Sequence, residues 1–198
     1  MESQMLKAVR EALAESISIK QQILQDDNLL SLITKIAEMC VAAYQRGNKI
    51  ILAGNGGSAA DAQHIAAEFV SRFQFDRPGL AALAITTDTS MLTAIGNDYG
   101  YERLFARQLE ANGRAGDVFF GISTSGSSKN ILAALECCRN KQITAIGLTG
   151  ANGRMSDLCD ICLHIPSAST PRIQEAHITI GHIICGLVES SIFAPNQS

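Results

Sequence analysis

Two short segments rich in small polar residues could bind a phosphate group. Residues 53–58 read AGNGGS and residues 122–128 read ISTSGSS, and each precedes a stretch with helical spacing. Glycine lets a ligand approach the backbone closely, and the unpaired N–H groups of a helix N-terminus attract anions. Capping a helix needs only one hydroxyl, so the serine-rich segment favours phosphate binding. The glycine-rich segment alone is also typical of a plain strand-to-helix turn, and it matches neither a dinucleotide fingerprint nor a P-loop.

A histidine and a glutamate four residues apart could bind a metal ion. His64 and Glu68 follow the glycine-rich segment at helical spacing, so their side chains share one face. An imidazole and a carboxylate are ligands that Zn²⁺ accepts. An isolated pair of this kind is more often a solvated polar face. The glycine-rich segment at the start of the same helix nevertheless places this pair near a candidate ligand site.

The last helical stretch, residues 171–193, carries polar side chains in an otherwise apolar sequence: Gln174, Glu175, His177 and His182. A buried polar group needs a partner or a function. Gln174 and His182 are eight residues apart, or roughly 12 Å along a helix axis. For both to reach one metal ion, their side chains must lean toward each other or come from two subunits. His182 is equally consistent with a hydrogen-bonded histidine of the core.

Short apolar runs alternate with amphipathic stretches from residue 49 onward, which predicts an α/β fold with a parallel sheet. The runs are almost continuously apolar, as expected of strands buried on both faces. Ligands of such sheets bind beyond the carboxyl ends of the strands, where both polar segments fall. The predicted strands cover residues 49–53, 82–86, 117–123, 143–149 and 160–165, and the predicted helices cover residues 58–73, 101–112, 127–139 and 171–193.

Two further helices are predicted within residues 1–46. Apolar residues recur at helical spacing in both, along Leu6, Val9, Leu13, Ile17 and Leu24 and then along Leu29, Ile33, Ile36, Cys40 and Tyr44. These apolar faces must be covered by the sheet or by a partner subunit. Because no repeat or linker divides the sequence, we expect one domain over residues 1–198, with helices in residues 1–46 and the α/β core in residues 47–198.

The composition argues against several classes of protein. Lys and Arg number 16 against 19 Asp and Glu, so the net charge of −3 favours neither nucleic acid nor an anionic membrane as a partner. The N-terminal residues do not resemble a signal peptide, and the apolar stretch 178–188 is too short to span a bilayer. Six cysteines include a lone CxxC, Cys159 to Cys162, which we expect to be inert thiols buried in a strand. These features predict a soluble intracellular protein.

Several motifs in the same order resemble the bacterial phosphoheptose isomerases of the sugar-isomerase (SIS) domain group. They are residues 55–64 with Glu68, residues 94–98 (AIGND), residues 121–126 (GISTSG), and residues 172–175 (RIQE) with His177 and His182. The resemblance covers nearly the whole chain, including both leading helices. It implies a three-layer sandwich in which helices flank a five-stranded parallel sheet. It also implies that the two N-terminal helices serve oligomerisation.

The resemblance implies an activity and an assembly as well. The activity is the isomerisation of D-sedoheptulose 7-phosphate to D-glycero-D-manno-heptose 7-phosphate, the first step toward ADP-heptose and the lipopolysaccharide core. The assembly is a cytoplasmic homotetramer with active sites at subunit interfaces and one Zn²⁺ per subunit. The implied metal ligands are His64, Glu68, Gln174 and His182. The implied substrate contacts are Asn55, Gly56, Gly57, Ser58, Glu68, Asn97, Asp98, Ser123, Thr124, Ser125, Ser128 and Gln174.

Isomerisation through an enediol needs a base, an acid and a group that stabilises the developing oxyanion. We expect Glu68 to be the base and His182 to move protons on the sugar oxygens or to help open the ring. A zinc ion would polarise the carbonyl. Since Glu68 cannot be a tightly bound ligand and a free base at one instant, either its coordination changes during turnover or one role is wrong. Pro171 departs from the family pattern, because some members have an aspartate there.

Two other functions are compatible with the same fold. The replication-initiator-associating protein DiaA, a non-catalytic binder of DnaA, resembles these isomerases but differs at the positions matching Glu68 and His182. Other SIS-type sugar-phosphate isomerases or regulators, acting on an arabinose phosphate or an amino-sugar phosphate, share the serine-rich segment. They do not share the combination of metal ligands named above. That combination favours the phosphoheptose isomerase.

Overall fold

Five parallel strands form one sheet in the computed structural model, which describes residues 3–194. They are β1 (Ile50–Gly54), β2 (Ala82–Ala84), β3 (Val118–Ser123), β4 (Thr144–Thr149) and β5 (Ile161–His164), in the spatial order β2-β1-β3-β4-β5. The chain adds β2 on one side of β1 and β3 on the other, so β1 and β3 flank a topological switch point. Gly54 pairs with Ile122 there, and the glycine-rich and serine-rich segments therefore leave the sheet side by side.

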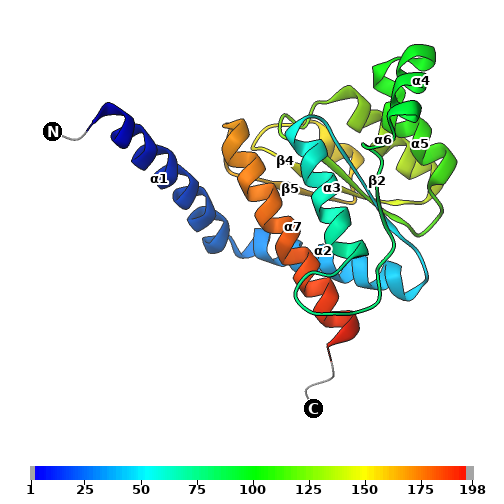
Figure 1. Ribbon diagram of the computed structural model, residues 1–198, viewed down its shortest axis with the longest axis horizontal. Helices are drawn as coiled ribbons and strands as arrows, with labels where there is room; N and C mark the ends of the chain where they lie inside the picture. Colours follow the sequence, from blue (N-terminus) through cyan, green and yellow to red (C-terminus); the bar gives the residue numbers. More distant parts are fainter. Residues whose placement is uncertain (1–2, 195–198) are drawn as a thin grey trace.

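Helices cover both faces of this sheet (Figure 1). α2 (Asp27–Gln45), α3 (Gly57–Val70) and α7 (Thr170–Phe193) pack on one face, and α5 (Leu104–Asn112) and α6 (Lys129–Lys141) pack on the other. Alternate strand residues supply the two cores: Ile50 and Leu52 point into the first, and Ile51 into the second. Every residue of β1 and of β3 is buried. The predicted three-layer sandwich with a five-stranded parallel sheet is confirmed.

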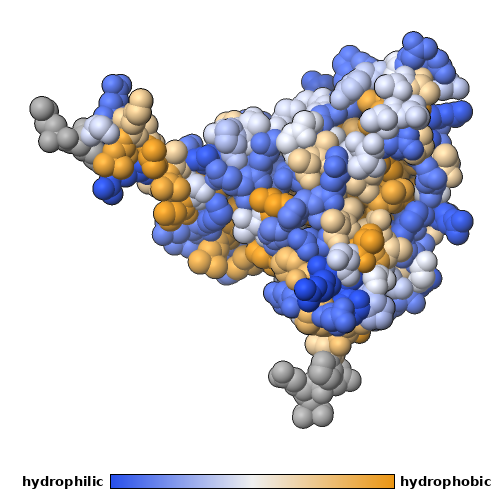
Figure 2. Space-filling model, viewed as in Figure 1, coloured by the Kyte–Doolittle hydropathy of each residue, from blue (hydrophilic) through white to orange (hydrophobic). Residues whose placement is uncertain are grey.

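The two N-terminal helices have different surroundings. Asp26 separates α1 (Gln4–Gln25) from α2, and its carboxylate caps α2 by accepting the Leu29 N–H at 3.1 Å. The apolar stripe of α2 packs into the core, whereas α1 projects from the body of the protein and buries Ile19 and Ile23 (Figure 1). Figure 2 shows apolar side chains exposed along α1. The exposed residues of its apolar stripe are Leu6, Val9, Leu13, Ile17 and Leu24. Within one chain, the sheet does not cover this face.

Several elements differ from the prediction. The sequence analysis did not predict α4 (Thr89–Tyr99), in which Ile95 is buried, Leu92 is half-buried, and Met91 and Tyr99 are exposed. The predicted helix 101–112 begins as a 3-10 turn, η1 (Tyr101–Arg103), before α5. A further 3-10 turn, η2 (Met155–Leu158), precedes β5. β5 begins at Ile161, so Cys159 lies in the preceding bend and not in the strand.

α7 is the central helix of the first core. By length and composition alone this helix could cross a membrane, which corrects the expectation drawn from residues 178–188. Half of its most apolar window is buried within the protein, however, and polar side chains such as His177 and Glu189 lie fully buried along it. Both observations are typical of the core helix of a globular domain.

Candidate active site

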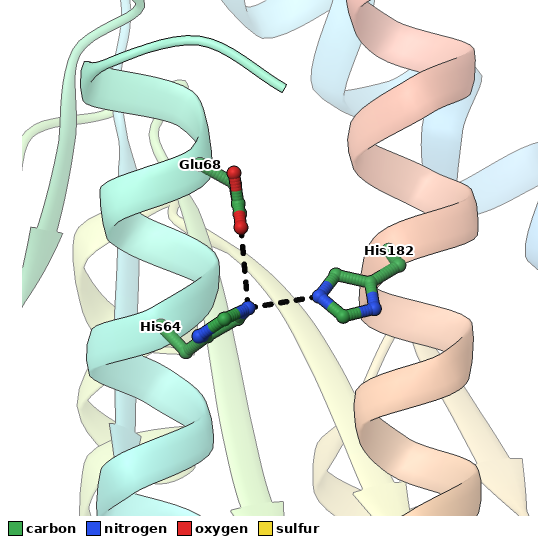
Figure 3. A group of neighbouring side chains, drawn as sticks. All are labelled: His64, Glu68 and His182. Carbon is green, nitrogen blue, oxygen red and sulfur yellow. Dashed lines mark hydrogen bonds and ion pairs between the residues drawn. The ribbon is translucent and has the colours of Figure 1, made fainter. Parts of the chain in front are cut away.

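Three candidate metal ligands from two helices meet at one point. His64 and Glu68 project from α3 and His182 projects from α7 toward them (Figure 3). The Nε2 atoms of the two histidines are 2.8 Å apart, and Glu68 Oε1 is 3.2 Å from His64 Nε2. The three ligand atoms all lie within 4.8 Å of one another. Two imidazoles and a carboxylate form a donor set suited to Zn²⁺, so these residues fit the metal that the sequence resemblance implies.

A glycine sets the distance between the two helices. A Cβ at Gly181 would lie 2.6 Å from Ile65 Cδ1, which is closer than a real side chain tolerates. Gly181 precedes His182 and Ile65 follows His64, so α3 and α7 pack closely beside the histidine pair. Without a side chain at position 181, the imidazoles can come within contact distance.

The segment after α3 covers His182. The ring of Phe73 stacks on His182, with a centroid distance of 5.5 Å and an interplanar angle of 21°. Glu189 of α7 holds this segment, because its carboxylate accepts the N–H groups of Phe73 at 2.8 Å and Gln74 at 2.7 Å. The Arg77 guanidinium donates to Glu189 at 2.9 Å and to the Glu68 carbonyl at 2.8 Å. The buried ion pair of Arg77 and Glu189 thus connects the end of α3, the segment that contains Phe73, and α7.

The two polar segments form a second group of donors. Asn55 and Asn130 exchange reciprocal amide hydrogen bonds of 2.9 and 2.8 Å, which join the glycine-rich segment to the first turn of α6. In the serine-rich segment, the hydroxyl of Ser123 lies 2.9 Å from that of Ser128 and 3.4 Å from that of Ser125. Ser128 is the N-cap of α6, yet its side chain makes no capping hydrogen bond. The helix N-terminus and these hydroxyls therefore suit an anion.

The structure places the other predicted site residues as follows. The Gln174 amide lies against Gly57, seven residues or about 10 Å along α3 from His64, so within one chain Gln174 does not join the three ligands. The Asn97 amide donates to Asp98 at 2.8 Å, and both residues are exposed near the end of α4. Ser58 is buried in the first turn of α3, Gly56 precedes that helix with a φ of 56°, and the Thr124 carbonyl accepts the Gly150 N–H.

Comparisons with known proteins agree with this geometry. Residues 13–150 match the family described as the SIS domain. The phosphoheptose isomerase of Aneurinibacillus thermoaerophilus is 65% identical, over 93% of this chain and 94% of its own length. Phosphoheptose isomerase 2 of Campylobacter jejuni is also 65% identical, over 93% and 92%. The solved phosphoheptose isomerase of Neisseria gonorrhoeae superposes with a TM-score of 0.88 at 42% identity, covering 94% of this chain and all of that one.

The chain belongs to the phosphoheptose isomerases of the SIS-domain family. The resemblance stated from the sequence motifs is therefore confirmed. Membership accounts for the sheet order and for the position of both polar segments at the carboxyl ends of β1 and β3.

Sequence reasoning missed four residues near the site of this family member. Phe73 and Arg77 follow α3 and gave no motif signal. Tyr101, whose hydroxyl donates to Asn55 at 2.9 Å, lies in the 3-10 turn that the pattern did not separate from α5. Asp61 stands one helical turn before His64, and its buried Oδ2 has no hydrogen-bond partner. Burial raises the pKa of Asp61, and the nearby His64 opposes that rise. The i, i+3 spacing of Asp61 and His64 was the one available signal.

Gly57→Ala is expected to displace Gln174 while preserving the fold. The added Cβ would lie 2.5 Å from Gln174 Nε2, the flexible end of that side chain. Moving the amide should lower activity roughly 10- to 100-fold. Stability should change by less than about 1 kcal/mol, because alanine is accepted at the start of a helix. Steady-state kinetics of a double-mutant cycle with Gln174→Ala checks this. If Gly57→Ala lowers activity by the same factor whether residue 174 is glutamine or alanine, its effect does not act through Gln174, and the prediction is wrong.

His177 is expected to weaken the folded state in mild acid. It is fully buried, and its Nε2 lies 3.3 Å from the Thr149 carbonyl oxygen. Burial lowers the pKa of His177 to about 4, against a smaller opposing effect of that hydrogen bond. Below about pH 6.5, His177 is protonated in the unfolded chain but stays neutral in the folded protein. The free energy of unfolding therefore falls by up to about 3 kcal/mol as the pH approaches 4. Urea unfolding from pH 7 to 4.5 should show a shallower pH dependence for His177→Gln. Identical slopes for the two proteins contradict this assignment.

Proposed function

We propose that this protein interconverts D-sedoheptulose 7-phosphate and D-glycero-D-manno-heptose 7-phosphate through an enediol. The observation that carries the proposal is the meeting of His64, Glu68 and His182 in a chain that is 65% identical to phosphoheptose isomerases. The protein is an isomerase, and its substrate is a sugar phosphate. The reaction is the entry step to heptose biosynthesis.

Glu68 serves as the base that moves a proton between C1 and C2 of the open-chain sugar. Its carboxylate reaches the open side of the cluster, and its side chain is about a quarter exposed (23%). His182 exchanges protons with the sugar oxygens, and stacking on Phe73 holds its ring in one orientation. The hydroxyls of Ser123, Ser125 and Ser128 bind the phosphate at the N-terminus of α6. General acid–base catalysis of this kind contributes about 10²- to 10⁴-fold to a rate.

A zinc ion is the proposed cofactor, one per subunit. His64, Glu68 and His182 would hold it, because their ligand atoms already converge. When bound, the ion supplies a Lewis acid that polarises the substrate carbonyl. Gln174 reaches the same ion only if its side chain moves away from Gly57 or if it comes from a neighbouring subunit. Glu68 must then alternate between metal binding and proton transfer.

The proposed assembly is a cytoplasmic homotetramer with active sites at subunit interfaces. Two surfaces support an assembly. The exposed apolar stripe of α1 needs a covering partner, and a hollow of about 390 Å³ beside His182 is lined by the exposed apolar side chains of Ile183 and Leu187. Light scattering at micromolar concentration tests the tetramer. A monomer at that concentration contradicts it.

The first test of the activity uses sedoheptulose 7-phosphate with the untreated protein, with chelator-treated protein and after zinc add-back. We expect the heptose product to form, to decline with chelator and to return with zinc. Turnover that does not change with the chelator supports the isomerase activity and contradicts the proposal that it requires zinc. Absence of turnover in all three conditions, with capture of the DnaA initiator, overturns the isomerase in favour of a DiaA-like binder.

A further inference from the structure

The CxxC segment lies at the opposite end of the sheet from the isomerase site. Cys159 ends η2, the chain bends at Asp160, and Cys162 is the second residue of β5. The two thiols are partly exposed, whereas the other four cysteines are buried. The expectation that this pair is buried in a strand is therefore wrong, because both residues are half-buried and Cys159 precedes β5.

The bend brings the two sulfur atoms together over Gly147 of β4. A Cβ at Gly147 would lie 2.8 Å from Cys159 Sγ and 2.9 Å from Cys162 Sγ, so both sulfurs share the space that the missing side chain leaves. A disulfide requires such a close approach of the two side chains.

The surroundings distinguish the two thiols. The Cys159 hydrogen bond lowers the pKa of Cys162 against the opposing effect of burial, and His164 and Ser156 lower it further. His164 lies on the same side of β5, and its Nε2 is 2.8 Å from the Ser156 hydroxyl. The same hydrogen bond, together with burial, raises the pKa of Cys159. Cys162 is therefore the better nucleophile, because the thiolate is the reactive form.

A hollow lined by Cys159 gives small molecules access to the CxxC segment, and the Cys162 sulfur lies next to that of Cys159 over Gly147. The hollow has a volume of about 400 Å³, and Cys159, Arg139 and Asp160 contribute to its lining. The exposed Arg139 guanidinium, which donates to the Asp157 carbonyl at 3.1 Å, offers a positive charge to an oxidant that carries carboxylates. The Asp160 carboxylate, which accepts the Ala145 N–H at 2.7 Å, adds a negative charge to the same hollow. Thr144 and Ala145 at the start of β4 also line the hollow, which separates it from the phosphate-binding segments at the other ends of the strands.

We propose that Cys159 and Cys162 form a reversible intrachain disulfide by exchange with small, negatively charged disulfides such as oxidised glutathione. The Cys162 thiolate attacks one sulfur of the oxidant, forms a mixed disulfide and releases one thiolate. Cys159 then loses its proton to solvent and attacks Cys162 Sγ, which releases the second thiolate. Two cysteine thiols are oxidised by two electrons in total, and one oxidant disulfide is reduced to two thiols. Cytoplasmic disulfides of this kind are transient, and a reducing thiol reverses them.

The test is mass spectrometry of the purified full-length protein after incubation with oxidised glutathione. We expect the wild type to lose two hydrogens per chain, mapped to the peptide that contains both cysteines, and to regain them with dithiothreitol. Cys159→Ser should instead retain one glutathione on Cys162, and Cys162→Ser should remain unmodified at Cys159. The four buried cysteines are internal controls.

Three outcomes would overturn the proposal. They are a wild type that remains unmodified at these two positions, a stable glutathione adduct on the wild type, and an adduct on Cys159 in the Cys162→Ser protein. Neither cysteine belongs to the isomerase site, so both variants should keep wild-type turnover, and this confirms that they are folded. Failure of the disulfide therefore leaves the proposed isomerase activity untouched.

Discussion

Glu68→Gln is expected to reduce turnover of sedoheptulose 7-phosphate by about 10²- to 10⁴-fold. The substitution preserves the size of the side chain and removes its capacity to accept a proton from carbon. It also weakens the ligand set, because an amide oxygen replaces a carboxylate 3.2 Å from His64 Nε2. Steady-state kinetics with and without added zinc separates the two effects. If turnover of the variant stays low at saturating zinc, Glu68 acts as the base. If added zinc restores turnover, Glu68 acts only as a metal ligand.

A matched control for this variant is Glu136→Gln. Glu136 lies exposed on α6, so the same chemical change there should leave both turnover and stability unchanged. His182→Ala should also fold normally and lose turnover, since His182 contributes from α7 to the same cluster. Near wild-type rates for Glu68→Gln or for His182→Ala would show that the proposed mechanism is wrong.

Glu189→Gln is expected to lower the free energy of unfolding by about 3–5 kcal/mol. The Glu189 side chain is fully buried and its partner Arg77 is 2% exposed, so the neutral amide leaves a guanidinium without a counter-charge in the core. Burial alone would raise the pKa of Glu189, but hydrogen bonds from the Gln74 and Phe73 N–H groups and from Arg77 lower it below its ordinary value. The carboxylate is therefore ionised at neutral pH. Its contribution is complete above the unfolded-state pKa and is lost as the pH falls toward the folded-state value.

Urea unfolding at one fixed protein concentration measures this loss, because an assembly makes stability depend on concentration. If Glu189→Gln alone fails to fold, the double variant Arg77→Met with Glu189→Gln keeps the prediction testable. It removes the buried charge and keeps an acceptor for the Phe73 and Gln74 N–H groups. We expect it to be more stable than Glu189→Gln. Equal or lower stability of the double variant contradicts the assignment of the loss to an unpaired charge.

Local patterns in the sequence determined most of the secondary structure. Apolar runs predicted all five strands. β1 and β3 are buried on both faces and therefore need apolar residues at consecutive positions, whereas the edge strands β2 and β5 are only partly buried. The apolar stripe of α2 likewise predicted that helix, which Asp26 caps in the structure. α4 was missed although Leu92, Ile95 and Tyr99 recur at helical spacing. The helix is only 11 residues long, and its cap, Asp88, is an ordinary turn residue by sequence.

The site followed from the sequence only in part. His64 and Glu68 are four residues apart on one helix, so the backbone geometry alone places them together. The serine-rich segment also follows its strand directly. Assigning the two groups to one function required the family resemblance, because neither spacing nor composition relates them to a sugar phosphate.

Only the tertiary structure decided which distant residues meet. His182 joins His64 across a separation of 118 residues because Gly181 lets α7 approach α3, while Gln174 on the same helix lies against Gly57. Arg77 and Glu189, 112 residues apart, have no signal in a local pattern, and the CxxC motif does not show that its two sulfurs meet over Gly147 of β4. Periodicity reports which face of an element is buried, and it carries no information about which side chain on another element lies opposite. That pairing arises from the packing of whole helices and strands.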